Sequence, residues 1–153
     1  KPIEGLNIAA GYSYNDSRYT KTNKVNGGLI EGDRLVRTPA NTANLSFFYN
    51  IPSGKLKGFS VGTIGNYIGE RFGGWNDQYV VNAITKVVTI NDRDIPLTGY
   101  TTIDFSAGYT WKKWNILCKL SNVTNELNYT VHENYSVNPI APRQILTSIK
   151  YKF

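Results

Sequence analysis

The sequence predicts an all-β fold, an antiparallel sheet of about six long strands that forms a segment of a transmembrane β-barrel. Three observations carry this prediction. Apolar and polar residues alternate over long runs, aromatic residues fall near the ends of those runs, and short connections alternate with long ones. Alternation with a period of two is the pattern of a strand whose two faces meet different environments, and no segment shows helical periodicity.

The alternating runs define the strands. We predict strands over residues 6–15, 43–51, 59–67, 101–111, 116–121 and 144–153. Their polar positions are mostly Gly, Ser, Asn and Thr, small neutral side chains that suit a barrel lumen better than the outer face of a soluble sheet. Most of the runs are also longer than the five or six residues that are typical of globular strands.

Aromatic residues stand near the strand ends, where the two interfacial girdles of a membrane barrel require them. They are Tyr12, Tyr14, Tyr49, Tyr67, Tyr109, Trp111, Tyr151 and Phe153. Tyrosine alone accounts for 11 residues. A soluble antiparallel sandwich also alternates, and it stays open as an alternative fold.

The connections place tight turns at one end of the sheet and long loops at the other. The turns PSGKLKG (52–58) and KKW (112–114) are short, whereas the connections around 20–40, 73–99 and 130–142 are long. Outer-membrane barrels have short periplasmic turns and long extracellular loops. We therefore expect the long loops outside the cell and the C-terminus in the periplasm, with a small hairpin in the stretch VVTINDRDIPL of the second loop.

Composition excludes several classes of protein. The 153 residues carry a formal net charge of +6, but the basic residues do not gather in one run, which argues against nucleic acid as a partner. No apolar stretch approaches the roughly 20 residues of a helical membrane span. The single Cys118 excludes an internal disulfide, and Cys118 with the single His132 makes no zinc cluster. His132 stands at a predicted strand-to-loop junction with Glu133 merely adjacent, which does not make a catalytic triad, so we expect no enzyme and no cofactor.

The final third of the chain carries a resemblance. The segment LTGYTTIDFSAGYTWKKWNILCKLSNVTNELNYTV, followed by NPIAPRQILTSIKYKF, resembles the C-terminal end of TonB-dependent outer-membrane receptors. The shared positions are Tyr100, Asp104, Gly108, Tyr109, Leu120, Asn122, Asn125, Tyr129, Ala141, Pro142 and Arg143. The C-terminal Phe153, with Tyr151 and Ile149 before it, resembles the signal that outer-membrane barrels present to the barrel-assembly machinery.

The resemblance implies a barrel of about 22 strands that encloses an N-terminal plug. We expect residues 1–153 to be the C-terminal part of that barrel, strands 17 to 22, with the plug and the earlier strands elsewhere in the same receptor. The chain begins at Lys1 without Met, which favours a fragment. The resemblance also implies active import of a small molecule such as a ferric siderophore, driven by TonB through the missing N-terminal part.

The long loops would then capture the ligand. Aromatic rings stack on flat ligands and arginines pair with anionic ones. The candidate ligand-binding residues are Arg71, Phe72, Trp75, Tyr79, Arg93, His132 and Tyr135. The loop 73–99 is the strongest region, because loops of this length in compact proteins are usually functional. Asp104 and Lys119, on the polar positions of neighbouring strands, are predicted to pair across the sheet.

Three alternatives stay open. An importer of oligosaccharides would share the same barrel end. A complete small barrel that acts as an adhesin or a structural protein would need residues 79–86 and 87–92 as two further spanning strands, and each is shorter than the roughly nine residues required. A soluble sandwich could bind carbohydrate through its aromatic residues.

Overall fold

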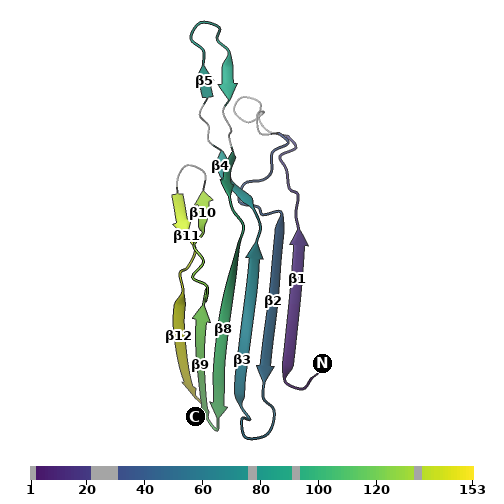
Figure 1. The fold of residues 1–153 in the computed structure, drawn as a ribbon, viewed down its shortest axis with the longest axis vertical. Coiled ribbons are helices and arrows are strands. Elements are labelled where there is room, and N and C mark those ends of the chain that lie inside the picture. Colours follow the sequence, from purple (N-terminus) through teal and green to yellow (C-terminus); the bar gives the residue numbers. More distant parts are fainter. Residues whose placement is uncertain (1–2, 22–30, 76–78, 91–93, 133–135) are drawn as a thin grey trace.

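The computed structural model describes residues 3–21, 31–75, 79–90, 94–132 and 136–153, and its elements are all β-strands (Figure 1). Six of them form one antiparallel sheet in the order β1-β2-β3-β8-β9-β12. Their bounds are Leu6–Tyr14 (β1), Asn41–Asn50 (β2), Phe59–Ile68 (β3), Tyr100–Trp111 (β8), Trp114–Ser121 (β9) and Gln144–Tyr151 (β12). They match the six runs of alternating residues, so the predicted all-β antiparallel fold is confirmed.

The pairing register keeps the alternation in phase across the whole sheet, because directly opposed residues in antiparallel strands share a face. Ser106 lies opposite Gly62 and Lys119, whereas Phe105 lies opposite Thr63 and Leu120. One face, the polar face, therefore carries mainly small polar side chains. The other, the apolar face, exposes Ile8, Tyr12, Tyr14, Leu45, Phe47, Tyr67, Ile103, Phe105, Tyr109, Trp111, Trp114, Ile116, Ile145, Ile149 and Tyr151.

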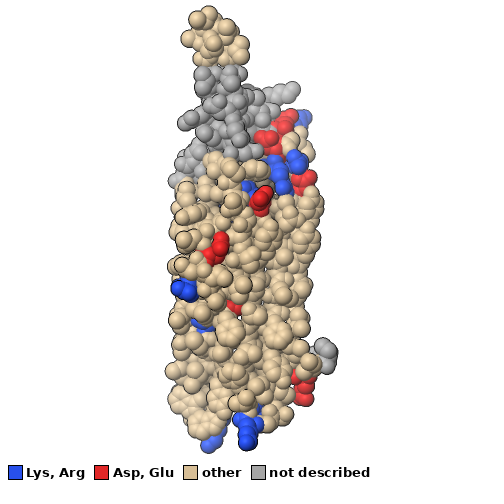
Figure 2. Space-filling model, viewed as in Figure 1, with Lys and Arg blue, Asp and Glu red and all other residues tan. Residues whose placement is uncertain are grey.

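The six-stranded sheet is a single layer without a conventional hydrophobic core. Among the residues whose burial the structure describes, Val131 is the one buried hydrophobic side chain. Exposing apolar area to water costs about 25 cal/mol per Å², so an apolar face of this extent is stable only beside an apolar surrounding. Figure 2 shows one side of the molecule, on which charged side chains are sparse over the middle of the sheet and gather toward its ends.

Within the described residues, no helix has the length and hydropathy that crossing a membrane requires.

Glycines on the polar face make room for larger neighbours. A Cβ at Gly62 would overlap the ring of Phe48 and would lie 2.8 Å from Ser106 Oγ. By contrast, a Cβ at Gly65, on the apolar face of the same strand, would meet nothing within 4 Å. The two positions form a matched pair for testing the close packing of the polar face.

Replacing Gly62 with Ala should force the ring of Phe48 out of its position, and we expect a loss of about 1–3 kcal/mol in the free energy of unfolding. The loss can be measured as a lower midpoint of heat-induced mobility shift on gels of the intact protein in detergent. Gly65→Ala is the control and should leave the midpoint unchanged. Equal midpoints for the two variants would show that the contact with Phe48 does not constrain the polar face.

The connections alternate as predicted, with the short turns 51–58 and 112–113 at one end and the long connections 15–40, 69–99 and 122–143 at the other (Figure 1). The second long connection forms an arm of two hairpin tiers. At its base β4 (Arg71–Trp75) pairs with β7 (Asp94–Leu97), and farther out β5 (Tyr79–Val81) pairs with β6 (Val88–Ile90).

The predicted hairpin within VVTINDRDIPL is therefore wrong. Both strands of this stretch pair back to residues 71–81, and the turn of the outer hairpin lies earlier in the chain. Asn82 builds that turn, because its Oδ1 accepts hydrogen bonds from the backbone N–H groups of Ile84 (2.9 Å) and Thr85 (3.0 Å). Lys86 completes it in the left-handed region with φ 58°.

The third long connection contains another hairpin, which the sequence did not predict. Its strands are β10 (Tyr129–His132) and β11 (Ser136–Pro139). This hairpin and the arm rise from the same end of the sheet (Figure 1).

Candidate functional site

The candidate ligand-binding residues lie on the two hairpins at the long-loop end. Arg71, Phe72 and Trp75 belong to β4, Tyr79 begins β5, and His132 ends β10. The two remaining candidates, Arg93 and Tyr135, lie outside the described residues. The structure thus brings the described candidates onto neighbouring elements of one end of the sheet, and the bases of the two hairpins show how they are held.

Arg71 is buried, with 6% of its surface exposed, and its guanidinium joins three segments of the chain. Nη1 donates to the carbonyl oxygen of Thr98 (3.2 Å), and Nη2 donates to Oδ1 of Asn128 (3.2 Å) and to the carbonyl oxygen of Tyr129 (2.6 Å). Its Cζ lies 5.2 Å from the ring centroid of Tyr100, within cation–π range. We call Arg71, Thr98, Tyr100, Asn128 and Tyr129 the Arg71 clamp.

Asn128 adds further hydrogen bonds to the clamp. It is buried, its Nδ2 donates to the carbonyl oxygen of Thr98 (3.3 Å), and its Oδ1 accepts from the N–H of Tyr129 (2.8 Å). Beyond the clamp the backbones of β4 and β10 approach closely, since a Cβ at Gly73 would lie 2.7 Å from Cβ of Val131. The arm and the β10–β11 hairpin are therefore joined at their bases.

Asn122 fixes the point at which the chain leaves β9. Only 4% of its surface is exposed, and it adopts φ 48°, a left-handed conformation that Asn tolerates better than most residues. Its Nδ2 donates to the carbonyl oxygens of Glu126 (3.0 Å) and Ala141 (2.9 Å), and its Oδ1 accepts from the N–H of Glu126 (2.8 Å). The side chain thereby ties the outgoing segment to the segment that returns to β12.

Asp104 and Lys119 form the predicted cross-strand ion pair, with 2.7 Å between Lys119 Nζ and Asp104 Oδ2. The other carboxylate oxygen of Asp104 accepts a hydrogen bond from the N–H of Asn122 (2.9 Å). Both side chains remain partly exposed on the polar face, so the pair contributes under about 1 kcal/mol by itself. Through these two contacts, Asp104 connects β8 to β9 and to Asn122, the residue directly after β9.

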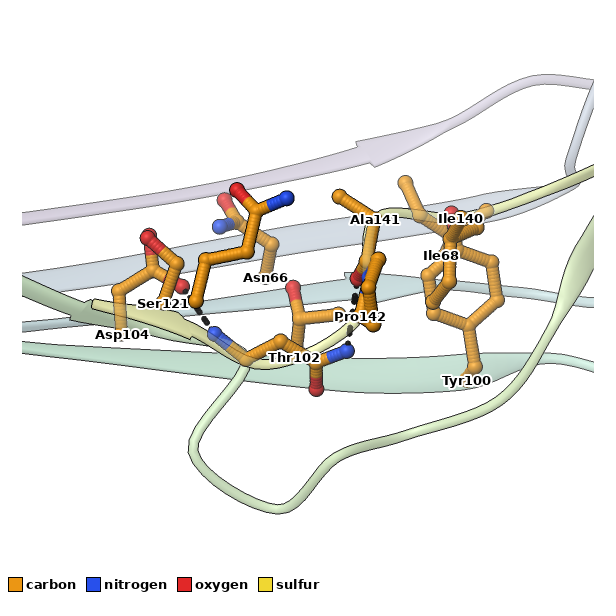
Figure 3. Close-up of a pocket in the computed structure, with 11 residues that line it drawn as sticks. Asn66, Ile68, Tyr100, Thr102, Asp104, Ser121, Ile140, Ala141 and Pro142 are labelled. Atoms are coloured by element: carbon orange, nitrogen blue, oxygen red, sulfur yellow. Dashed lines mark hydrogen bonds between the residues drawn. The ribbon is translucent and has the colours of Figure 1, made fainter. Parts of the chain in front are cut away.

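A hollow of about 460 Å³ lies on the polar face beside this pair (Figure 3). Strands β3, β8 and β9 form its floor, and the returning segment 140–142 passes along it. Its polar lining comprises Asn66, Thr102, Asp104, Ser121, Asn122 and Gln144, and its apolar lining comprises Ile68, Tyr100, Ile140, Ala141 and Pro142.

No group of three or more His, Cys, Asp and Glu side chains in the described part of the chain is placed to hold a metal ion. The arrangement at the long-loop end offers instead two hairpins with aromatic residues, positioned by one buried arginine and two buried asparagines.

Comparison with known proteins identifies the family. Residues 4–125 match the family model described as TonB dependent receptor-like, beta-barrel. The metal-pseudopaline receptor CntO of Pseudomonas aeruginosa is 26% identical over 152 residues, which cover 98% of this chain and 19% of the relative. The chain therefore spans about a fifth of the length of the curated relatives that it matches.

Solved structures show the same fold. The ferric preacinetobactin receptor BauA of Acinetobacter baumannii aligns with a TM-score of 0.74 and 21% identity, over 99% of this chain and 20% of that one. The ferripyoverdine receptor of the outer membrane of Pseudomonas aeruginosa aligns with a TM-score of 0.70 and 21% identity, over 100% of this chain and 18% of that one. Since the family model spans most of the sequence, the chain belongs to the TonB-dependent receptor-like β-barrel family.

Proposed function

We propose that this chain is the C-terminal part of the barrel of an outer-membrane receptor that imports a ferric siderophore or a similar metal chelate. One observation carries the proposal: a single-layer sheet with an uncovered apolar face, a small polar opposite face and long hairpins at one end only. A barrel wall between lipid and a polar lumen accounts for both faces. The names of the metal-pseudopaline and ferric preacinetobactin receptors support a metal chelate as cargo.

The proposal includes an orientation and partners. The arm and the β10–β11 hairpin face the outside of the cell, whereas the short turns and Phe153 lie in the periplasm. Six strands leave β1 and β12 as open edges, and earlier strands of the same receptor pair with them. The plug occupies the polar lumen, TonB acts through the N-terminal part, and Phe153 is read by the barrel-assembly machinery.

Ligand contact is assigned to the hairpins. Phe72, Trp75, Tyr79, Arg93, His132 and Tyr135 are proposed to contact the ligand. Arg71 shares β4 with Phe72 and Trp75, but its guanidinium donates to three oxygens of the chain itself. We therefore assign Arg71 to positioning the two hairpins.

Uptake of radioactive iron by cells tests the proposal. Deleting the gene that encodes the full-length receptor should abolish uptake of one ferric siderophore, and the wild-type gene should restore it. Dissipating the inner-membrane proton gradient should stop uptake in the complemented cells. A deletion strain that imports all tested iron chelates normally but loses an oligosaccharide would contradict the metal-chelate assignment.

Shortening the arm gives a sharper version of the same test. A receptor in which residues 76–93, which include the outer hairpin β5–β6, are replaced by a short Gly-Ser turn keeps β4, β7 and the Arg71 clamp. We expect it to reach the membrane in normal amount and to lose ferric-siderophore binding by tenfold or more, because the proposed contacts of Tyr79 and Arg93 are removed. Unchanged binding would place ligand capture elsewhere on the receptor.

A further inference from the structure

Two lysines at the short-turn end lie over aromatic rings of the apolar face. Lys112 Nζ lies 5.0 Å from the ring centroid of Trp111, and Lys113 Nζ lies 5.9 Å from that of Tyr151. Trp111 and Tyr151 both belong to the apolar face and are 54% and 43% exposed. The two ammonium groups are therefore on the apolar side of the rim, although the turn that carries them could have directed them toward the polar face.

The rings beneath these lysines form a continuous aromatic surface. The centroids of Trp114 and Tyr151 are 4.8 Å apart, and those of Tyr151 and Phe153 are 5.2 Å apart. Farther along the same strands the apolar face continues with Ile116 and Ile149, which are opposed in the register of β9 and β12. We call Trp111, Lys112, Lys113, Trp114, Tyr151 and Phe153 the rim cluster.

The neighbouring turn adds positive charge. Lys55 and Lys57 lie in residues 51–58, and this turn is joined to β8 by a hydrogen bond from the N–H of Thr110 to the carbonyl oxygen of Gly58 (2.9 Å). Neither short turn contains Asp or Glu. Within the described part of the chain, Lys55, Lys57, Lys112 and Lys113 form no ion pair. Figure 2 shows basic side chains projecting at this end of the molecule.

We propose that the rim cluster binds the headgroup of an anionic phospholipid in the leaflet beside the short turns. The lysine ammonium groups contact the lipid phosphate, the rings lie at headgroup depth, and the acyl chains run along Ile116 and Ile149. This inference rests on the proposed function for the placement of the sheet in a membrane. An aromatic surface that passes directly into an apolar face matches a lipid, whereas a free phosphate would use only the lysines.

Native mass spectrometry of the purified full-length receptor tests the site with phosphatidylglycerol and phosphatidylcholine of the same acyl chains as probes. The wild-type receptor should retain phosphatidylglycerol in preference to phosphatidylcholine. A lysine near a membrane surface increases the affinity for anionic lipid by a factor of about five. The double variant Lys112→Gln/Lys113→Gln should therefore weaken phosphatidylglycerol binding by about tenfold or more. Lys86→Gln, an exposed lysine in the turn of the outer hairpin, is the matched control and should bind like wild type.

Folding and uptake are measured on the same variants. Heat-modifiable gel mobility confirms that the double variant is folded before its lipid retention is read. Unchanged retention of phosphatidylglycerol by the folded double variant would overturn the site, and so would displacement of the lipid by inorganic phosphate at equal concentration. Failure of the proposed function has a different signature, because the wild-type receptor itself would then fail to import any ferric siderophore.

Discussion

Replacing Arg71 with Ala should lower the free energy of unfolding of the full-length receptor by about 3 kcal/mol or more and release the arm and the β10–β11 hairpin from each other. The variant removes three hydrogen bonds from a charged donor, each of which contributes about 1.5–3 kcal/mol in such settings. It also leaves the buried Oδ1 of Asn128 with the N–H of Tyr129 as its remaining described partner. The loss can be measured as a lower melting temperature and as new protease cleavage in the arm on intact cells.

Two further variants make the Arg71 result interpretable. Arg71→Lys keeps the charge but cannot donate in the same forked geometry, so we expect an intermediate melting temperature. Arg143→Ala removes an exposed arginine near the same end of the sheet and should resemble wild type. If Arg71→Ala had the same melting temperature and the same protease resistance as Arg143→Ala, the Arg71 clamp would have no role in joining the hairpins.

Replacing Asn122 with Ala is the second large change, and we expect a loss of about 3–5 kcal/mol. The variant removes three side-chain hydrogen bonds at a buried position and places a Cβ-bearing residue without a polar side chain at φ 48°. The outgoing and returning segments of the third long connection would then separate. The midpoint of the heat-induced mobility shift of the full-length receptor measures the effect.

Asn122→Gly separates the two causes, because glycine accepts the left-handed conformation but lacks the side chain. Its midpoint should fall between those of wild type and Asn122→Ala. Asn115→Ala, which removes one exposed hydrogen bond of 2.8 Å to Thr110, is the matched control and should cost under about 1 kcal/mol. A midpoint for Asn122→Ala no lower than that of the control would contradict the anchoring role.

The sheet was predictable because, in each strand, the side chains at every second position face the same environment, and the sequence alternates accordingly. Alternation located all six strands, and a short turn between β8 and β9 fixed a register in which Asp104 and Lys119 come together. The long connections carry no such repetition. The pairing of Val88–Ile90 with Tyr79–Val81 depends on a turn built by one asparagine, Asn82, whose hydrogen bonds are not encoded in a periodic pattern.

The sequence predicts that the candidate residues lie at the long-loop end, but it does not predict which of them are held in contacts with the rest of the chain. Arg71 stands beside Phe72 in the sequence, and this pattern predicts a ligand contact because nothing nearby shows that Arg71 is buried. Its partner Asn128 is 57 positions away, and that contact exists only once β4 and β10 are adjacent. Asn122 belongs to the motif that carried the family resemblance, yet the motif does not reveal which carbonyl groups its amide would bind.

The proposed function requires the sheet to be a barrel wall, with lipid beside its apolar face and a polar lumen beside the other face. Site-directed spin labelling tests it most directly, with single cysteines placed at 101–110 of the full-length receptor in liposomes after Cys118 is replaced by Ser. We predict that accessibility to oxygen peaks at positions such as 103, 105 and 107, and that accessibility to a water-soluble nickel complex peaks at 102 and 106. A profile without alternation, or with the opposite phase, would show that the apolar face of β8 does not face lipid.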